Sequence, residues 1–480
     1  MSRQVLTPAA IALNRFGLGA VAGEAAPGDP KRYLLDQFQR FEASTPEFAQ
    51  LPDGGALVTQ YLADRRDIRQ AATPASPQAN PMGNAAARPQ RSDEQRAMRR
   101  NYAQEVRALY RQAAQARMTS ALSTPAPFIE RMVHFWANHF CVSADNPQTI
   151  ALVGAFERDA IRPNVLGRFD DMLIAVEQHP AMLIYLNQAQ SVGPNSPAAQ
   201  MAASRNPNRK RGLNENLARE IMELHTLGVR SGYTQTDVTE FARALTGWTV
   251  SGTGGGMPGE PLAFLFRPRQ HEPGARTIVG RTYDQLGPDQ GLPALADFAA
   301  SPQTAVHVAT KLARHFAGDP PPQALIDRLA ATFTRTRGDL PALYKALIES
   351  PEPWAPDAVK FRNPWDWTVA SLRLLGQGVL SQMQTVNVLD QLGQPVWKPG
   401  SPAGWDDLAA SWAAPDALLR RVEIAQRLAS LAGDRIDART AGPQLLPGSL
   451  SPATAEQVAR AESPATALAL LLVSPDMLRR

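Results

Sequence analysis

Apolar residues recur along most of the chain at the three- and four-residue spacing of amphipathic helices. Segments that alternate as strands do are scarce. The best candidate is 264–267, which we expect to form a hairpin with 277–279. Proline, with 41 residues, separates the helical segments. The pattern predicts a mainly α fold, a large irregular helical bundle with at most a small β-hairpin.

Two stretches of small polar residues and proline interrupt the helical pattern. Residues 71–91 have a low-complexity composition that cannot build a core, so we expect a disordered loop there. This loop would separate an N-terminal helical segment, 1–70, from a helical core domain, 92–480, that opens with a long helix over 92–118. Residues 194–212 are predicted to form a mobile loop. We expect both helical parts to share one continuous core.

One predicted helix carries a carboxylate where its pattern requires an apolar residue. Its apolar stripe consists of Leu213, Leu217, Ile221, Leu224 and Leu227. Glu220 falls inside this stripe, and Asn216 and Glu223 flank it at the i−4 and i+3 positions. A buried carboxylate is costly unless it is paired, metal-bound or protonated. The sequence therefore makes Glu220 the candidate centre of function.

A second predicted helix, 128–140, has a histidine in the same kind of place. His139 projects from the middle of the apolar face, whereas His134 lies with Glu130 on the polar side and Asn138 lies at the border. One interpretation is a core histidine hydrogen-bonded to a backbone carbonyl or a nearby side chain. The other is a site that His139 shares with Glu220.

A helix near residues 304–316 carries a group of basic side chains. His307, Lys311 and Arg314 share the side opposite its apolar residues. The simplest interpretation of this group is a solvated basic face.

Composition excludes several classes of protein. A net charge of +4 is small for 480 residues, and no run of interleaved basic and aromatic residues suggests a nucleic-acid partner. The single cysteine, Cys141, excludes an intramolecular disulfide and a cysteine-rich zinc site. The segment 467–473 is too short to span a membrane. Pro8 and Asn14 interrupt the first apolar run, so we expect no signal peptide and a cytoplasmic location, with periplasmic or secreted locations left open.

Several short motifs follow one another along the chain. They are 14–19 (NRFGLG), 135–140 (FWANHF), 214–220 (NENLARE), 223–228 (ELHTLG), 232–238 (GYTQTDV), 244–248 (ALTGW), 271–274 (HEPG) and 393–405, which begins GQPV and ends GW. This ordered set resembles the signature of the domain-of-unknown-function 1800 family of bacterial proteins. The resemblance implies a mostly helical protein and supplies no catalytic residue. Members are often exported and encoded near proteins that resemble the alkaline phosphatase and sulfatase fold, which implies a partner of that fold.

Two hypotheses for the function follow. In the first, the chain is a binding or scaffolding protein that acts with a partner protein, and its loops at 71–91 and 194–212 order on that partner. Glu220 would then belong to a structural network with Asn216, Arg219 or Arg243.

In the alternative, the chain is an enzyme of unknown substrate with a buried His/Glu site. Glu220 and His139 would be catalytic, either as a general acid–base pair or with a divalent metal ion as cofactor, held by His139, Glu220 and Glu223. The candidate binding residues around them are Asn138, Asn216, Arg219, Glu223, His225, Arg243 and His271.

Overall fold

The computed structural model describes residues 5–71, 93–205, 212–252 and 262–480. Within these ranges the chain is mostly α-helical and has two small antiparallel sheets of two strands each. The predicted mainly α fold is confirmed. No described helix is both long and apolar enough to cross a bilayer. The loop predicted at 71–91 lies, except for Ala71, outside the described residues.

The first half of the chain contains α1 (Pro8–Ile11), α2 (Pro30–Leu35), α3 (Gln37–Arg40), α4 (Pro46–Ala49), α5 (Gly54–Ala71), α6 (Asp93–Ser123), α7 (Pro127–His139), α8 (Val153–Phe156), α9 (Phe169–Glu177), α10 (Pro180–Tyr185), α11 (Pro197–Arg205), α12 (Asn216–Glu220) and α13 (Gln235–Ala244). Two π-helical segments extend helices of this half: η1 (Ala12–Phe16) follows α1, and η6 (Ile221–His225) follows α12.

The second half contains the strands β1 (Trp248–Val250), β2 (Phe264–Phe266), β3 (Arg276–Ile278) and β4 (Arg281–Tyr283). Its helices are α14 (Gly291–Ala299), α15 (Pro302–Ala317), α16 (Gln323–Thr336), α17 (Leu340–Glu349), α18 (Pro364–Leu375), α19 (Gln377–Leu380), α20 (Thr385–Gln391), α21 (Pro415–Ala432), α22 (Ala438–Leu445), α23 (Pro452–Ala459), α24 (Pro464–Leu472) and α25 (Pro475–Leu478).

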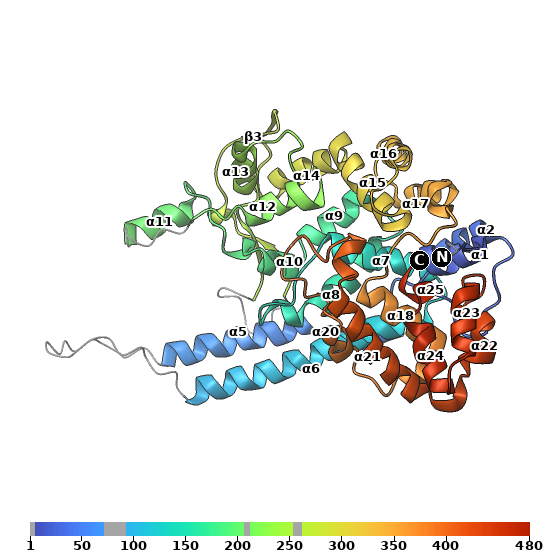
Figure 1. The fold of residues 1–480 in the computed structure, drawn as a ribbon. Coiled ribbons are helices and arrows are strands. Elements are labelled where there is room, and N and C mark those ends of the chain that lie inside the picture. Colours follow the sequence, from blue (N-terminus) through green and yellow to red (C-terminus); the bar gives the residue numbers. More distant parts are fainter. Residues whose placement is uncertain (1–4, 72–92, 206–211, 253–261) are drawn as a thin grey trace.

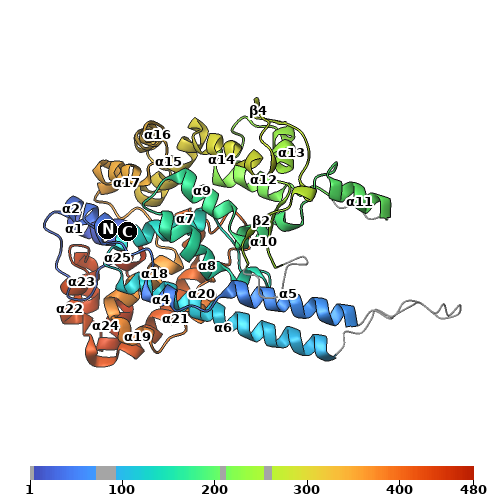
Figure 2. The ribbon, with the colours of Figure 1, turned by 180° about the vertical axis from the view of Figure 1, so that it is seen from behind.

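The helices form one body, from which the pair α5 and α6 and the single helix α11 project. α5 and α6 run side by side and extend beyond the body, and α11 projects on the same side (Figures 1 and 2). The two ends of the chain lie close together, since Val5 and Arg479 pair with Asp357 and Phe361, respectively. One contiguous cluster of buried apolar side chains reaches from Leu6 to Met477 and includes residues of both halves.

Helix α7 lies inside the body, and this position buries its polar side as well as its apolar side (Figure 1). Glu130 is fully buried and pairs with Arg162, with an Oε1–Nη1 distance of 2.8 Å. His134, with a side chain that is 9% exposed, receives a hydrogen bond from the indole N–H of Trp365 (3.2 Å). The polar side of α7, which carries His134 and Glu130, is thus covered by neighbouring elements.

Local sequence signals explain where many helices begin. Proline stands at the first or second position of α1, α2, α7, α10, α15 and α18, where the missing N–H leaves no hydrogen bond unmade. At α13 the Thr234 side chain accepts from the N–H of Asp237 (3.2 Å), and the Asp237 carboxylate accepts from the N–H of Thr234 (2.7 Å). These reciprocal bonds are the capping box that the sequence contains.

The strands pair differently from the predicted hairpin. β2 pairs with β1, in the register Thr249 opposite Leu265, and β3 pairs with β4. The prediction that 264–267 pairs with 277–279 is therefore wrong. Trp248–Val250 form a strand in which all three residues are buried. Such a short continuous apolar run has no alternation, so periodicity does not distinguish it from the end of a helix.

The segment predicted as a mobile loop, 194–212, contains the helix α11. None of the residues of α11 is buried, and Met201 is 46% exposed. Residues 206–211 lie outside the described residues.

Candidate functional site

The buried face of the helix that contains Glu220 is rotated from the predicted stripe, of which Leu217 and Ile221 are buried and Leu224 is half-buried. Ala218, Met222 and His225 are fully buried, whereas Glu220 and Leu224 are half-buried. Successive helical residues are about 100° apart, so a core face centred on Ala218 and His225 turns Glu220 toward the edge. A hydrophobic pattern gives little weight to alanine and histidine. The face predicted from the larger apolar residues was therefore misplaced. The prediction that Glu220 lies inside the core is wrong.

The carboxyl group of Glu220 has a modified electrostatic environment but no bound partner. Partial burial raises the pKa of Glu220; His225 acts in the opposite direction, and the nearby Glu223 raises it further. Neither a hydrogen bond nor an ion pair joins Glu220 to His139 or to any other described residue. Asn216 is exposed, and Arg219 makes an ion pair with Glu215 (3.0 Å) on the surface.

Two further candidates lie near the small sheets. Arg243 pairs with Glu240, one turn earlier on α13. Nδ1 of His271 donates to the carbonyl oxygen of Thr246 (2.8 Å), and its ring packs against Phe266 with the centroids 5.4 Å apart. These contacts attach the loop around His271 to the end of α13.

His139 and His307 bind the carbonyl groups at the end of η6. Nε2 of His139 donates to the carbonyl oxygen of His225 (3.1 Å), and Nε2 of His307 donates to that of Leu224 (3.0 Å). The last carbonyl groups of a helix lack partners within the helix, so these imidazoles satisfy them from α7 and α15. Burial lowers the pKa of His139 well below its usual value and that of His307 to about 4. This geometry favours the first interpretation of His139, a core histidine hydrogen-bonded to a backbone carbonyl.

His225 binds a buried carboxylate that the sequence analysis missed. Its Nδ1 lies 2.7 Å from Oε1 of Glu177, and both side chains are fully buried. Glu177 ends α9 on the same side as the buried Leu173, four residues earlier. The signal that singled out Glu220, a carboxylate on an apolar helix face, applies to Glu177 and would have found it.

Metal ligation gains no geometric support. The described ranges contain no group of three or more His, Cys, Asp or Glu side chains arranged to hold a metal ion. His139, Glu220 and Glu223 do not form such a group, so their role as ligands of a divalent metal stays a prediction.

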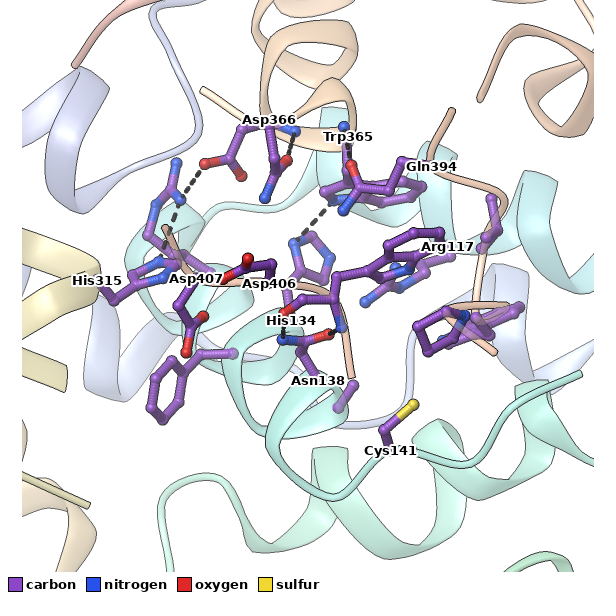
Figure 3. A pocket seen from close by; sticks show the side chains of 18 of the residues that line it. Arg117, His134, Asn138, Cys141, His315, Trp365, Asp366, Gln394, Asp406 and Asp407 are labelled. Atoms are coloured by element: carbon purple, nitrogen blue, oxygen red, sulfur yellow. Dashed lines mark hydrogen bonds and ion pairs between the residues drawn. The ribbon is translucent and has the colours of Figure 1, made fainter. Parts of the chain in front are cut away.

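A cavity opens between α6, α7, α15, α18 and the segment 394–407 (Figure 3). The cavity volume open to a water-sized molecule is about 80 Å³, and the unfilled space reaches about 820 Å³ only when the open mouth is included. Its walls include Phe135, Asn138, Cys141, Lys311, Trp365, Trp397, Trp405, Asp406 and Asp407. Aromatic walls with a small number of polar groups are typical of sites for small molecules.

Two of the motifs that carry the family resemblance meet at this cavity. The side-chain amide of Asn138 donates to the carbonyl oxygen of Trp405 (2.9 Å) and accepts from its backbone N–H (2.7 Å). The adjacent Gly404 has a φ of +78°, and a Cβ at this position would lie 2.3 Å from the carbonyl oxygen of Asn138. Glycine is therefore needed for this approach. Asn138, one of the candidate binding residues, positions the loop that forms one wall.

An arginine stacked between two indoles forms another wall. The Arg117 guanidinium lies 4.4 Å from the ring centroid of Trp365 and 5.2 Å from that of Trp397. Glu157 neutralises it at 2.8 Å and also accepts from the indole N–H of Trp397 (2.9 Å). Cation–π contacts and a buried ion pair thus hold this wall rigid.

The charges at the inner end of the cavity are paired. Asp366 binds both Arg131 (2.9 Å) and Arg480 (3.1 Å), and the two guanidinium groups hold its pKa well below its usual range against the effect of burial. Burial lowers the pKa of His315, and its Nε2 accepts from Arg480 (3.3 Å). Figure 3 shows His315 beside Asp407 and across the cavity from Arg117.

Lys311 is the exception among these charges. It makes no hydrogen bond or ion pair with a described residue. Burial lowers the pKa of Lys311, and Asp407 is the strongest group acting in the opposite direction. The predicted solvated face of His307, Lys311 and Arg314 is only partly exposed, since all three residues are half-buried. The segment 394–407 and α7 enclose this side of α15.

The amine of Lys311 also faces a second, open groove. This groove is lined by Leu224 of η6, by Leu227 just after it and by residues of α15. It shares Lys311 and Asp407 with the cavity. Lys311 therefore stands where the interior cavity and the surface groove meet.

The rarity of lysine in the composition could have drawn attention to Lys311. Only six of the 49 basic residues of the chain are lysines, so a lysine within an amphipathic helix is unusual here. Cys141 also lines the cavity, but burial raises the pKa of its thiol to about 12, which keeps it protonated.

Fold and site together define a mainly helical protein with an aromatic-walled cavity. The family model described as "Protein of unknown function (DUF1800)" matches residues 11–479, and the chain belongs to this family. The family resemblance of the motifs is confirmed. No curated protein and no solved structure matches the chain.

Proposed function

We propose that this protein binds a small amphipathic organic molecule in the cavity beside Lys311. The observation that carries the proposal is the convergence of two family motifs on a cavity with aromatic walls and an unpartnered lysine. The proposal differs from the predicted binding or scaffolding protein, because its ligand is a small molecule and not a partner protein, and its site lies away from Glu220.

The lining indicates the chemistry of the ligand. Phe135, Trp397 and Trp405 offer apolar ring surfaces, which favour a planar or aromatic portion of the ligand. Lys311 and Asp407 offer a donor and an acceptor at one end of the same space. A ligand with an apolar ring and one polar group fits this arrangement.

The test uses 1-anilinonaphthalene-8-sulfonate, a fluorescent ring system that carries one polar group. We expect one site per chain and an affinity that falls by about tenfold or more, or about 1.4 kcal/mol, in Trp405→Ala. Trp412→Ala is the matched control, since Trp412 lies outside the lining and its ring centroid is 5.7 Å from that of Trp405. Titration followed by fluorescence, with thermal unfolding as a check on folding, measures both.

Equal affinity of the wild type and Trp405→Ala would place the probe elsewhere and end the proposal. Filling the cavity with Ala137→Leu provides a second variant, because Ala137 lines the space and is 6% exposed. The affinity for the probe should also fall in this variant.

A second candidate function is the predicted action with a partner protein. It is favoured by α11, none of whose residues is buried, and by the projecting pair α5 and α6 (Figure 2). The family resemblance suggests a partner of alkaline-phosphatase or sulfatase-like fold. Size-exclusion chromatography of the two purified proteins tests this candidate. A complex that survives in wild type and is lost in Met201→Glu supports it, and independent elution contradicts it.

The predicted enzyme with Glu220 and His139 as an acid–base pair has weaker support. His139 already uses its Nε2–H for the carbonyl of His225, and Glu220 lies at the edge of a different helix.

A further inference from the structure

Among the described lysines, the buried Lys360 and the half-buried Lys311 have different surroundings. Nζ of Lys360 lies 3.0 Å and 3.2 Å from the two carboxylate oxygens of Asp319 and also donates to the carbonyl oxygen of Asp407. Lys311 has no such partner, although Asp407 lies at the same cavity. Burial lowers the pKa of both lysines. An ion pair with Asp319 opposes this at Lys360, whereas at Lys311 the main opposing group is the charge of Asp407, which makes no ion pair with the amine.

An unpaired enclosed amine offers chemistry that arginine does not. A guanidinium stays charged, whereas a lysine freed of its proton is a nucleophile. This chain uses arginine for almost all of its basic residues, including the buried ion pairs at Glu130, Glu157 and Asp366. A lysine at position 311 therefore supplies the cavity with a group that the arginines cannot replace.

We propose that Nζ of Lys311 forms an imine with an aldehyde or ketone group of the bound ligand, at the junction of the cavity and the surface groove. The proposal rests on the ligand-binding function above and specifies its ligand class as carbonyl compounds with an apolar ring. The aromatic walls would hold the ring while the carbonyl carbon faces Lys311.

The step is a condensation without change of oxidation state. The lone pair of Nζ forms a bond to the carbonyl carbon, and the carbonyl oxygen takes up protons and leaves as water when the C=N bond forms. Both hydrogens of the amine end in that water molecule. Asp407 lines both spaces, and its carboxylate makes no hydrogen bond with a described residue. It therefore accepts a proton from the nitrogen and returns it to the departing hydroxyl.

The experiment traps the imine on the full-length protein. Benzaldehyde is added with sodium cyanoborohydride, which reduces an imine to a stable benzylamine, and peptide mass spectrometry locates the benzyl groups. We expect labelling at Lys311 to exceed that at the exposed Lys398 by about tenfold or more, because burial lowers the pKa of Lys311 and the cavity holds the aldehyde beside its amine. Lys360, paired with Asp319, should label least.

Variants separate the alternatives. Lys311→Met and Lys311→Arg should lose the label at this position, Asp407→Asn should slow it, and Lys345→Met should leave it unchanged. Equal labelling of Lys311 and Lys398, or a rate at Lys311 that Asp407→Asn does not alter, would overturn the proposal. The fluorescent probe keeps the two proposals apart. If it still occupies the cavity while Lys311 stays unlabelled, binding stands and the imine does not; if it fails to bind, the binding proposal itself falls.

Discussion

The end of η6 and the cavity beside Lys311 both place polar side chains among apolar ones, but their hydrogen bonding differs. Within the described residues, Nδ1 of His139, Nε2 of His225 and Oε2 of Glu177 make no hydrogen bond, yet each histidine at η6 has one partner. At η6, His139, His307 and His225 each donate a ring N–H to an acceptor within the protein. At the cavity, Lys311 and Asp407 keep their side-chain donors and acceptors free of described partners.

This difference teaches how to separate structural from functional polar residues in a helical protein. A buried polar group costs free energy, and a matching partner in the chain offsets that cost. A group that stays unmatched at the wall of a cavity has no such compensation in the free protein. Such an unmatched polar group is explained if a bound ligand supplies its hydrogen-bonding or ionic partner. The following predictions test this contrast by changing one region at a time.

The largest expected effect is the loss of stability in mild acid, and it arises in the η6 region. The folded-state pKa of His307 is about 4, below the unfolded value of about 6.5, so the folded protein binds fewer protons between these values. Stability is therefore full above pH 6.5 and declines as the pH falls toward 4, by about 3 kcal/mol for this residue alone. Burial lowers the pKa of His139, His134 and His315 as well, which adds to the loss.

Urea unfolding at a series of pH values measures this dependence. Paired carboxylates do not explain it, because those of Glu130 and Asp366, with pKa values well below the usual range, weaken only below about pH 4. His307→Gln keeps a donor for the Leu224 carbonyl and should flatten the slope between pH 6.5 and 4. An unchanged slope in this variant would mean that His307 is not held neutral.

Breaking the His225–Glu177 pair should have the next largest effect. Glu177→Ala leaves a fully buried imidazole without its acceptor at 2.7 Å and opens a hole in the core. We expect a loss of about 3–5 kcal/mol in the free energy of unfolding. Glu223→Ala, a half-buried glutamate on the adjacent helix, is the control and should change stability by about 0.5 kcal/mol or less. Similar effects of both variants would show that burial and pairing do not set this region apart.

Lys311→Met should behave in the opposite way, because it removes an unpaired group. We expect stability to be unchanged or higher by up to about 1 kcal/mol, while labelling at this position disappears. Lys360→Met should instead cost about 1–3 kcal/mol, since it leaves the Asp319 carboxylate without its ammonium partner. Guanidinium unfolding of both variants provides the measurement. Destabilisation by Lys311→Met as large as that by Lys360→Met would assign Lys311 a structural role.

Parts of this contrast could be predicted from the sequence, and parts could not. Helix-period patterning located the long helix at 92–118, observed as Asp93–Ser123, and the Thr234–Asp237 cap, because both depend on nearby residues. The enclosure of Lys311 depends on the segment 394–407, which lies far from α15 in the chain. The burial of Glu130 depends on Arg162 from another element. A pattern within one helix does not contain such contacts.

The smallest expected effect concerns Glu220, which the sequence placed at the centre of function. Its carboxyl group is half-buried and without a described partner, so Glu220→Gln removes no hydrogen bond or ion pair. Partial burial raises its pKa, which means that the ionised form is slightly unfavourable above the unfolded value of about 4.3, and a neutral amide avoids this cost. We expect the unfolding free energy at pH 7 to change by about 0.5 kcal/mol or less, and probe binding and labelling of Lys311 to stay at wild-type levels. A loss of labelling in Glu220→Gln with intact folding would join the two regions into one site and restore Glu220 as a functional residue.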